Sequence, residues 1–306
     1  MNKYILLIFF LISNFQKVFS EKKPNIVIIM LDDMGYGDIE SFGAIDYYTP
    51  NINDLADNGM LFTNFYSAQA VCSASRAGLL TGTYPNRIGI NGALFPQSKV
   101  GLNSNEKTIA EILKEKKYKT AVIGKWHLGH QKEFLPLNHG FDYYYGIPYS
   151  NDMWPVDFDG NQITNNNDWR KKNYPQLPII ENYEKIGEVR TLDDQAKLTT
   201  IYTEKSVEFI NNNANKPFFL YVPHSMPHVP IAASDKFKGK SKQGLYGDVI
   251  MELDWSLGEI VKALKKNDII ENTIIVFTSD NGPWLNFGNH AGNTAGLREG
   301  KGTVFE

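Results

Sequence analysis

The sequence is poor in cysteine, with one among 306 residues, so it cannot form a disulfide within the chain. In an oxidising compartment, an unpaired cysteine is reactive, modified or buried. The sequence also lacks an Asn-x-Ser/Thr sequon, which weakens any prediction of lysosomal delivery through N-glycans. It has no internal repeat, and its formal net charge of −3 argues against nucleic acid as the main partner.

The first twenty residues have the pattern of a secretory signal peptide. Lys3 supplies a positive charge, residues 4–12 are apolar, and residues 18–20 (VFS) offer a cleavage site. The apolar run is too short to favour a membrane span. We expect cleavage after Ser20 and one domain over 21–306. The product would have no membrane span, would enter the secretory pathway, and would be extracellular or lysosomal.

The remaining pattern predicts an α/β fold with a doubly wound, largely parallel sheet flanked by helices. Apolar runs without alternation predict strands buried on both faces at 24–31, 120–123, 217–222 and 273–278. Amphipathic or capped segments predict helices at 49–59, 106–117, 193–211 and 246–266. We also expect a short strand at 60–65. Residues 141–190 show no clear period, and we expect an irregular excursion there that selects the substrate.

Polar residues follow each of the four predicted buried strands. They are Asp32 and Asp33, Lys125 and His127, His224 and His228, and Asp280 and Asn281. In sheets of this kind, ligands bind outside the carboxyl ends of the strands, so these groups should converge on one edge. We interpret His224 as a loop histidine held by neighbouring prolines, and we place His228 in the site.

Four of these residues, Asp32, Asp33, Asp280 and Asn281, offer oxygen ligands if the amide presents its carbonyl. Taken singly, each is an ordinary Asx turn or helix cap at a strand end. Two such ends on separate strands indicate a metal instead, because clustered carboxylates without a counter-ion repel one another. Carboxylate and amide oxygens suit Ca²⁺ or Mg²⁺ better than zinc.

The single cysteine begins a predicted helix over residues 72–82, which ends at Gly82. A lone cysteine is most often a small buried hydrophobe. However, Arg76 lies one turn along on the same face, and a helix start favours anions and activated sulfur. The pattern therefore indicates a nucleophile that faces an anionic substrate. With lysine and histidine donors around a cation, the site suits a tetrahedral oxyanion, either phosphate or sulfate.

Several motifs resemble those of the sulfatase family. Residues 72–76 (CSASR) with 79–82 (LLTG) resemble its first signature, and residues 124–129 (GKWHLG) carry the second. The Asp-Asp, Ser-Asp-Asn-Gly and Gly-Lys-Gly-Thr segments stand in family order. Residues 146–150 and 251–254 resemble the arylsulfatase A and N-acetylgalactosamine-6-sulfatase type. The resemblance implies an alkaline-phosphatase-like fold and an arylsulfatase-like sulfuric ester hydrolase.

The resemblance also implies that Cys72 is not used as a thiol. A formylglycine-generating enzyme would oxidise it to Cα-formylglycine, whose hydrate attacks the sulfur of a sulfate ester. Ala74 stands where proline is commoner, which affects only how well the site is modified. The implied Ca²⁺ site consists of Asp32, Asp33, Asp280 and Asn281, together with the hydrated residue 72.

Other roles follow from the same resemblance. Arg76 would steady the formylglycine. Lys125, His228 and Lys301 would bind the sulfate oxygens and assist the leaving alcohol. His127 would take the proton that releases sulfate, and Ser150 aligns with a substrate-binding serine. Family members continue past Gly-Lys-Gly-Thr into further strands and a small C-terminal domain, so residues 21–306 are expected to be an incomplete catalytic domain.

Two alternatives stay open at the level of sequence. A hydrolase of phosphate mono- or diesters could use the same scaffold, although such relatives generally carry serine or threonine at the nucleophile and bind zinc. A truncated product could also bind sulfated glycans without turnover. If the chain is a sulfatase, its partners are a sulfated small molecule or glycan and the formylglycine-generating enzyme.

Overall fold

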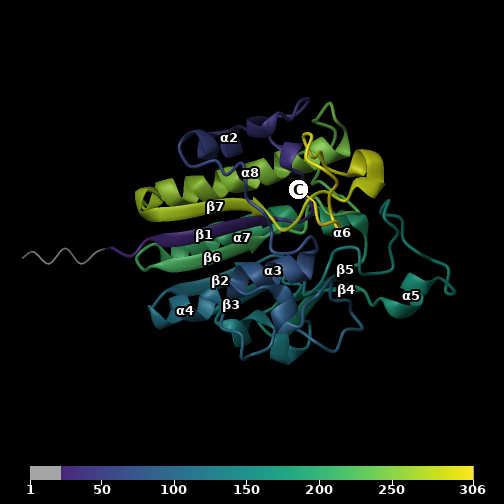
Figure 1. Cartoon of the computed structure of the whole chain (residues 1–306), viewed down its shortest axis with the longest axis horizontal. Coiled ribbons are helices and arrows are strands. Elements are labelled where there is room, and N and C mark those ends of the chain that lie inside the picture. The colour runs from purple at the N-terminus through teal and green to yellow at the C-terminus, as the bar shows by residue number, and fades with distance from the viewer. Residues whose placement is uncertain (1–21, 306) are drawn as a thin grey trace, which may run out of the picture.

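A mostly parallel seven-stranded sheet forms the centre of the computed structural model, which describes residues 22–305 (Figure 1). The predicted signal peptide lies outside the described residues. The strands are β1 (Asn25–Leu31), β2 (Lys119–Ile123), β3 (Tyr143–Gly146), β4 (Leu177–Glu181), β5 (Glu184–Val189), β6 (Phe218–Pro223) and β7 (Thr273–Ser279). Their order across the sheet is β5-β4-β3-β2-β6-β1-β7. Among the described residues, β4 pairs in antiparallel fashion with both β3 and β5, and the other pairings are parallel, so the predicted fold class is confirmed.

Helices cover both faces of the sheet. One layer holds α2 (Pro50–Asp57), α7 (Leu198–Asn213) and α8 (Leu245–Lys266), and the other holds α3 (Cys72–Thr81) and α4 (Ile109–Glu115). Two short helices, α5 (Trp169–Asn173) and α6 (Leu192–Ala196), lie beyond the strand ends (Figure 1). The 3₁₀ helices are η1 (Tyr36–Asp38), η2 (Glu40–Phe42), η3 (Pro85–Ile88), η4 (Lys132–Phe134), η5 (Pro136–His139), η6 (Ile270–Asn272) and η7 (Leu285–His290).

The sequence of β1 explains this layered arrangement. Val27, Ile29 and Leu31 belong to the core that includes α7 and α8, whereas Ile28 and Met30 face the core that includes α3. Successive side chains of a strand point to opposite faces, so an uninterrupted apolar run is needed when both faces are covered. The predicted burial of β1 on both faces is confirmed, and its last residue leads directly into Asp32.

The predicted strand at residues 60–65 is wrong. This segment connects α2 to α3 without regular structure, and Met60 and Phe62 are 77% and 64% exposed. Its apolar, β-rich composition suggested a strand. However, within the described range the segment pairs with no sheet edge, and a strand needs such a partner to satisfy its backbone.

The outermost parallel strand also differs from expectation, because β7 is not buried on both faces. Ile274 and Val276 are 51% and 39% exposed, since among residues 22–305 β7 has a neighbour in the sheet only on its β1 side. Composition cannot distinguish a central strand from an edge strand when both are rich in Ile and Val.

Two helical and loop predictions are correct only in part. Residues 141–190 contain β3, β4, β5 and α5, so the segment is not wholly irregular. The β4–β5 hairpin was missed because residues 184–188 are largely polar and exposed, without the apolar run of a buried strand. The helix expected over 193–211 is divided into α6 and α7 at Lys197.

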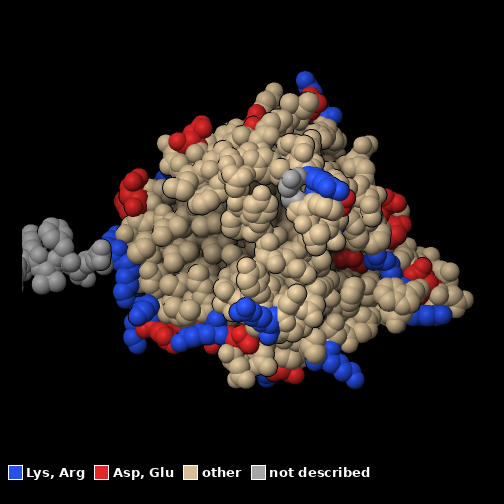
Figure 2. Space-filling model, viewed as in Figure 1, with Lys and Arg blue, Asp and Glu red and all other residues tan. Residues whose placement is uncertain are grey.

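Charged side chains are distributed unevenly over the surface. Figure 2 shows Lys, Arg, Asp and Glu mainly around the outline of this face, with few in its middle. Among residues 22–305, no helix combines the length and apolar character needed to cross a membrane.

Candidate active site

The carboxyl ends of β1, β2, β6 and β7 bring the predicted polar groups to one edge of the sheet. The C-terminal segment, yellow in Figure 1, lies over the same edge and adds Lys301. Lys301 reaches the site because its backbone N–H donates to the Pro283 carbonyl, and that of Gly302 donates to Ala70 just before α3. The predicted convergence is confirmed.

Two features of the backbone shape this edge. Gly124 has a φ of +142°, and a Cβ there would collide with the Pro223 carbonyl, so glycine allows β2 and β6 to end close together. Asp33 and His127 have φ values of +66° and +59°, a left-handed conformation that is uncommon outside glycine. Non-glycine residues held in this way cluster at functional sites.

Cys72 is buried at the start of α3, as predicted. Its sulfur lies 3.3 Å from Asp32 Oδ1 and 3.3 Å from Lys301 Nζ. Burial and the nearby Asp32 carboxylate raise the pKa of the thiol. This differs from the expectation of sulfur activated by the helix start, because the desolvation of a thiolate here outweighs the helix dipole and the lysines. Without a bound cation, burial therefore favours the neutral thiol over the more nucleophilic thiolate.

Arg76 lies one turn further along α3 and is completely buried. Its Nε and Nη2 donate to Asp280 Oδ2 at 3.0 and 2.8 Å, and its Nη1 donates to the Lys125 carbonyl at 2.8 Å. Nη2 is also 3.5 Å from Asp32 Oδ2. Arg76 thus connects α3 to the ends of β1, β2 and β7.

Two of the site carboxylates have pKa values that are shifted in opposite directions. Burial would raise the pKa of Asp32, but Lys125 and Arg76 beside it outweigh burial and hold that pKa well below its usual value. Burial and the charge of Asp32 raise the pKa of Asp280 to about 7. The site therefore disfavours further negative charge unless more positive charge is added.

A divalent cation would supply that charge, and the donor set fits one. Ligand atoms of Asp32, Asp33, Cys72 and His228 all lie within 4.8 Å of one another. Asn281 donates from Nδ2 to Asp33 Oδ1 at 2.7 Å, while its Oδ1 is buried with no partner. An orphaned amide oxygen beside two carboxylates is what a Ca²⁺ or Mg²⁺ site requires.

Asp280 stands apart from this set. Its Oδ2 accepts from Arg76, and its Oδ1 accepts from the Asp33 backbone N–H at 3.2 Å. His228 lies in the four-residue ligand cluster, whereas the sequence suggested only a role toward sulfate. Its Nδ1 lies 2.6 Å from the Val229 carbonyl and must therefore donate, so a neutral ring presents a bare Nε2 that is 3.6 Å from Asp33 Oδ2.

Two lysines approach the carboxylates from opposite sides. Lys125 Nζ pairs with Asp32 and donates to Ser150 Oγ at 3.0 Å. Lys301 Nζ lies 2.8 and 2.9 Å from the two oxygens of Asp33. Burial opposes its charge, but the Cys72 sulfur and Asp33 raise the pKa of Lys301 well above its ordinary value. Both lysines are therefore positioned to contact an anion beside Cys72.

His127 makes no direct hydrogen bond to this network. Its Nε2 lies 2.9 Å from the Leu94 carbonyl, which can only accept, so the neutral ring carries its proton there. Its Nδ1 is buried, has no partner, and is free of a proton. Burial and the charge of Lys125 hold the pKa of His127 well below 6.5. The ring can accept a proton at Nδ1.

Three contributors were not identified from the sequence. The Leu94 carbonyl sets the His127 tautomer, and a backbone carbonyl leaves no mark in a sequence. Trp284 contacts both His228 and Lys301, and its position just after the Ser-Asp-Asn-Gly segment was the available signal. Asp38 accepts hydrogen bonds from Gly35 N, Tyr246 Oη and Asn293 N, which ties the 290–293 segment to α8.

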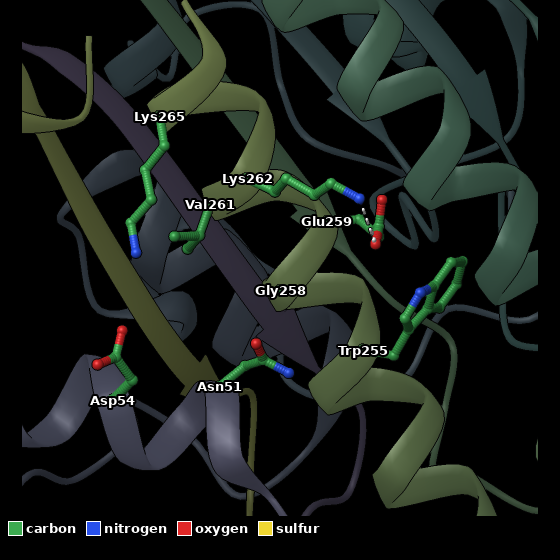
Figure 3. A pocket seen from close by; sticks show the side chains of 8 residues that line it. All are labelled: Asn51, Asp54, Trp255, Gly258, Glu259, Val261, Lys262 and Lys265. Atoms are coloured by element: carbon green, nitrogen blue, oxygen red, sulfur yellow. Dashed lines mark ion pairs between the residues drawn. The ribbon is translucent and has the colours of Figure 1, made fainter. Parts of the chain in front are cut away.

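A separate cavity lies between α2 and α8, away from these residues (Figure 3). Its volume is about 390 Å³, and none of the predicted site residues lines it. Its lining includes Asn51 and Asp54 of α2 and Trp255 and Gly258 of α8. Its mixed charges offer no cluster of donors for an anion.

Known proteins share both the sequence and the arrangement. The family model described as Sulfatase matches residues 24–303. N-acetylgalactosamine-6-sulfatase of Canis lupus familiaris is 38% identical over 300 residues, which cover 92% of this chain and 55% of that protein.

Solved structures agree with this match. The PsFucS1 sulfatase from Pseudoalteromonas sp. has a TM-score of 0.85 at 32% identity, covering 96% of this chain and 62% of that one. Ps i-CgsB in complex with k-i-k-neocarrahexaose has a TM-score of 0.78 at 34% identity, covering 92% and 63%. The chain spans about half the length of the curated relatives it matches. By sequence and by fold, the chain belongs to the sulfatase family.

Proposed function

We propose that this chain is the catalytic part of a sulfate ester hydrolase that acts through Cα-formylglycine at position 72. The observation that carries the proposal is the setting of Cys72. Its sulfur is held between an Asp32 oxygen and the Lys301 ammonium, in a cluster of side chains that also contains Lys125 and His228. A nucleophile there faces the donors that a sulfate group needs.

The raised pKa of Cys72 disfavours a thiolate at this position, which is consistent with a nucleophile other than sulfur. In this proposal, a formylglycine-generating enzyme oxidises the side chain to an aldehyde in the secretory pathway, and water hydrates that aldehyde. The hydrate carries two hydroxyls, so it can act as a nucleophile without ionisation of sulfur. The secretory route rests on residues 1–20, and we propose an extracellular or lysosomal destination.

One hydroxyl of the hydrate attacks the sulfur of the ester, and the bond from sulfur to the alcohol oxygen breaks. Lys125 and Lys301 would bind the sulfate oxygens and assist the leaving alcohol, His228 would join them when its Nε2 carries a proton, and Ser150 supports Lys125. A cation bound by Asp32, Asp33, Asp280 and Asn281, expected to be Ca²⁺, would supply further stabilisation of the charge on sulfate.

His127 completes the cycle. Its bare Nδ1 would take the proton of the second hydroxyl, the C–O bond to the sulfated oxygen would break, and sulfate would leave. The aldehyde returns and is hydrated again, so the net reaction is ester plus water to alcohol plus sulfate. The low pKa of His127 keeps it neutral and able to act as a base below pH 6.5.

We propose an aryl or carbohydrate sulfate as substrate. The oligosaccharide in the Ps i-CgsB structure supports a carbohydrate alcohol. Ser150 is the first residue of the stretch 150–176, which lies beyond the strand ends (Figure 1).

The test is to express the chain in a secretory host together with a control sulfatase that the host modifies. The peptide that contains residue 72 is weighed, and hydrolysis of 4-nitrophenyl sulfate and 4-nitrophenyl phosphate is measured. We expect the aldehyde at position 72 and activity toward the sulfate ester alone. An intact thiol beside a converted control would overturn the mechanism, and preference for the phosphate ester would favour a phosphate hydrolase. Cys72→Ala should be secreted and inactive, whereas full activity in that variant would refute the assigned nucleophile.

A further inference from the structure

One aromatic side chain contacts two of the proposed sulfate-binding groups at once. Lys301 Nζ lies over the Trp284 ring, 4.6 Å from its centroid. The His228 ring packs against the same indole with centroids 5.7 Å apart and planes at 61°. An ammonium within about 6 Å of an indole centroid is attracted by the negative face of the ring. Trp284 is half-buried at this edge of the site.

The indole is itself held firmly. Phe287 and Phe158 pack against it with centroids 4.8 and 5.6 Å away, both at steep interplanar angles. The Arg170 guanidinium lies 4.2 Å from the Phe158 centroid and donates to the Asp152 carbonyl. This chain of contacts fixes the ring plane, so the ring can define where Lys301 and His228 stand.

The ring matters most when a cation is bound. Both oxygens of Asp33 contact Lys301 Nζ, and Asp33 also belongs to the ligand cluster. A divalent cation would compete with Lys301 for those oxygens. The neutral indole does not bind the cation in this way, so it still attracts the Lys301 ammonium when the Asp33 oxygens bind the cation.

Lys125 shows the contrast. Its ammonium is completely buried and pairs with Asp32 and Ser150, at the end of a central strand. Lys301 comes from a turn near the C-terminus, and its side chain is 11% exposed. The lysine with the less rigid attachment is therefore the one beside an aromatic ring.

We propose that Trp284 is a positioning residue of this site, whose ring holds the Lys301 ammonium where it binds a sulfate group, with the His228 imidazole beside it, once Asp33 engages a cation. The inference rests on the proposed function, because it assigns that sulfate group to Lys301. The ring does not take part in bond making.

The experiment compares Trp284→Leu, Trp284→Phe and the matched control Trp255→Leu. Trp255 is also half-buried, and Lys236 Nζ lies 3.9 Å from its centroid, but it faces the α2–α8 cavity rather than the site (Figure 3). We measure kcat and KM for 4-nitrophenyl sulfate, and the dissociation constant of inorganic sulfate by calorimetry with Ca²⁺ present. Melting temperatures report on the fold.

We expect Trp284→Leu to lower kcat/KM and to weaken sulfate binding by about 5- to 30-fold each, the factor for losing one strong cation–π contact. Trp284→Phe should recover most of both losses, because it restores an aromatic face. Trp255→Leu should match the wild type in both. Wild-type values in Trp284→Leu would overturn the inference. A phenylalanine variant as impaired as the leucine variant would overturn it as well, since a role limited to filling space does not need the ring.

Two further readouts keep the inference open to refutation. If Trp284→Leu does not fold, fluorinated tryptophans at position 284 retain the shape and weaken the ring's negative face, and sulfate affinity should fall with each added fluorine. An unchanged affinity would overturn the inference. If the wild type hydrolyses no sulfate ester but binds sulfate, the proposed function fails, and the calorimetric comparison alone decides the role of Trp284. A wild type that neither hydrolyses the ester nor binds sulfate overturns both.

Discussion

The candidate active site has two halves that differ in attachment and in burial. The inner half is Asp32, Arg76, Lys125 and Asp280, whose side chains are completely buried and paired with one another. The outer half is Asp33, His228 and Lys301, whose side chains retain 3%, 3% and 11% exposure. The inner residues follow strand ends directly or come from α3, whereas His228 and Lys301 come from loops.

This difference separates two tasks. Inner residues satisfy each other's charges, and in doing so they connect β1, β2, β7 and α3. Outer residues lie at the proposed metal and substrate positions, which the inner residues also border, and their present partners can be exchanged there for a cation or a sulfate. We therefore expect changes in the inner half to affect the fold first, and changes in the outer half to affect chemistry first.

The largest effect should come from the inner half. Arg76→Met would leave Asp280 and Asp32 buried without their guanidinium, which should lower the free energy of unfolding by about 3–5 kcal/mol. Urea unfolding measures this loss. The surface pair of Lys107 and Glu115 provides the control, because both side chains are more than half exposed and Lys107→Met should leave the midpoint unchanged. Equal shifts in the two variants would refute the structural role of the inner half.

The next prediction breaks the outer half without breaking the fold. Lys301→Met removes one donor to the sulfate group, which should lower kcat by about 10²–10³-fold. With Ca²⁺ present, Asp33 keeps a positive partner, so the melting temperature should change little. Steady-state rates with 4-nitrophenyl sulfate and a thermal melt make the comparison with Arg76→Met. A variant that loses its fold as Arg76→Met does would erase the distinction between the halves.

A third prediction concerns a support of the outer half. Burial raises the pKa of Asp38 from 3.8 to about 6, although three hydrogen bonds oppose this. The folded chain therefore binds this proton more tightly than the unfolded chain. The resulting stability is complete below pH 3.8 and is lost as pH rises through about 6. Its size is about 3 kcal/mol by linkage.

Asp38→Asn should remove this slope. The free energy of unfolding in urea, measured at about pH 4 and about pH 7, should fall with pH more in the wild type than in the variant. The opposite ordering, or parallel slopes, would show that Asp38 does not titrate in this range. Asp38 acts on the site only through the 290–293 segment that it holds, whereas Lys301 is a proposed sulfate donor. The kcat of Asp38→Asn should therefore change less than that of Lys301→Met.

The smallest expected effect is that of metal removal. A cation that binds only the folded chain stabilises it by about 2.7 kcal/mol at one hundred times its Kd. Chelation should lower the unfolding midpoint, and Ca²⁺ should restore it. Asp33→Asn should abolish that response, whereas Asp38→Asn should retain it. If Ca²⁺ does not change the unfolding midpoint of the wild type, the proposed metal site is refuted.

Much of this arrangement could be predicted because parallel strands end at one edge. Asp32, Lys125, His228 and Asp280 follow separate apolar runs, so the topology alone brings them together. The helix from Cys72 to Gly82 was also readable, since a left-handed glycine ends it. These inferences depend on local pattern and sheet geometry, and neither requires the exact side-chain contacts.

The separate roles of the site residues could not be predicted from the sequence. Sequence placed Asp280 among the metal ligands, which stays a prediction, but it did not reveal the hydrogen bonds from Arg76 to Asp280, because these depend on side-chain packing. Sequence also suggested an activated sulfur at Cys72, because the pattern shows the helix start but not the complete burial that opposes a thiolate. The β4–β5 hairpin escaped notice since its polar residues carry no apolar run.

The burial of the one cysteine has a practical consequence for counting molecules. An unmodified chain contributes one thiol, which is hidden in the folded state and accessible after denaturation. A converted chain contributes none under either condition. Titration of a denatured sample with a coloured thiol reagent therefore gives the fraction of chains left unconverted, without proteolysis or a mass spectrum. The same reagent applied to native protein reports only the molecules that have opened.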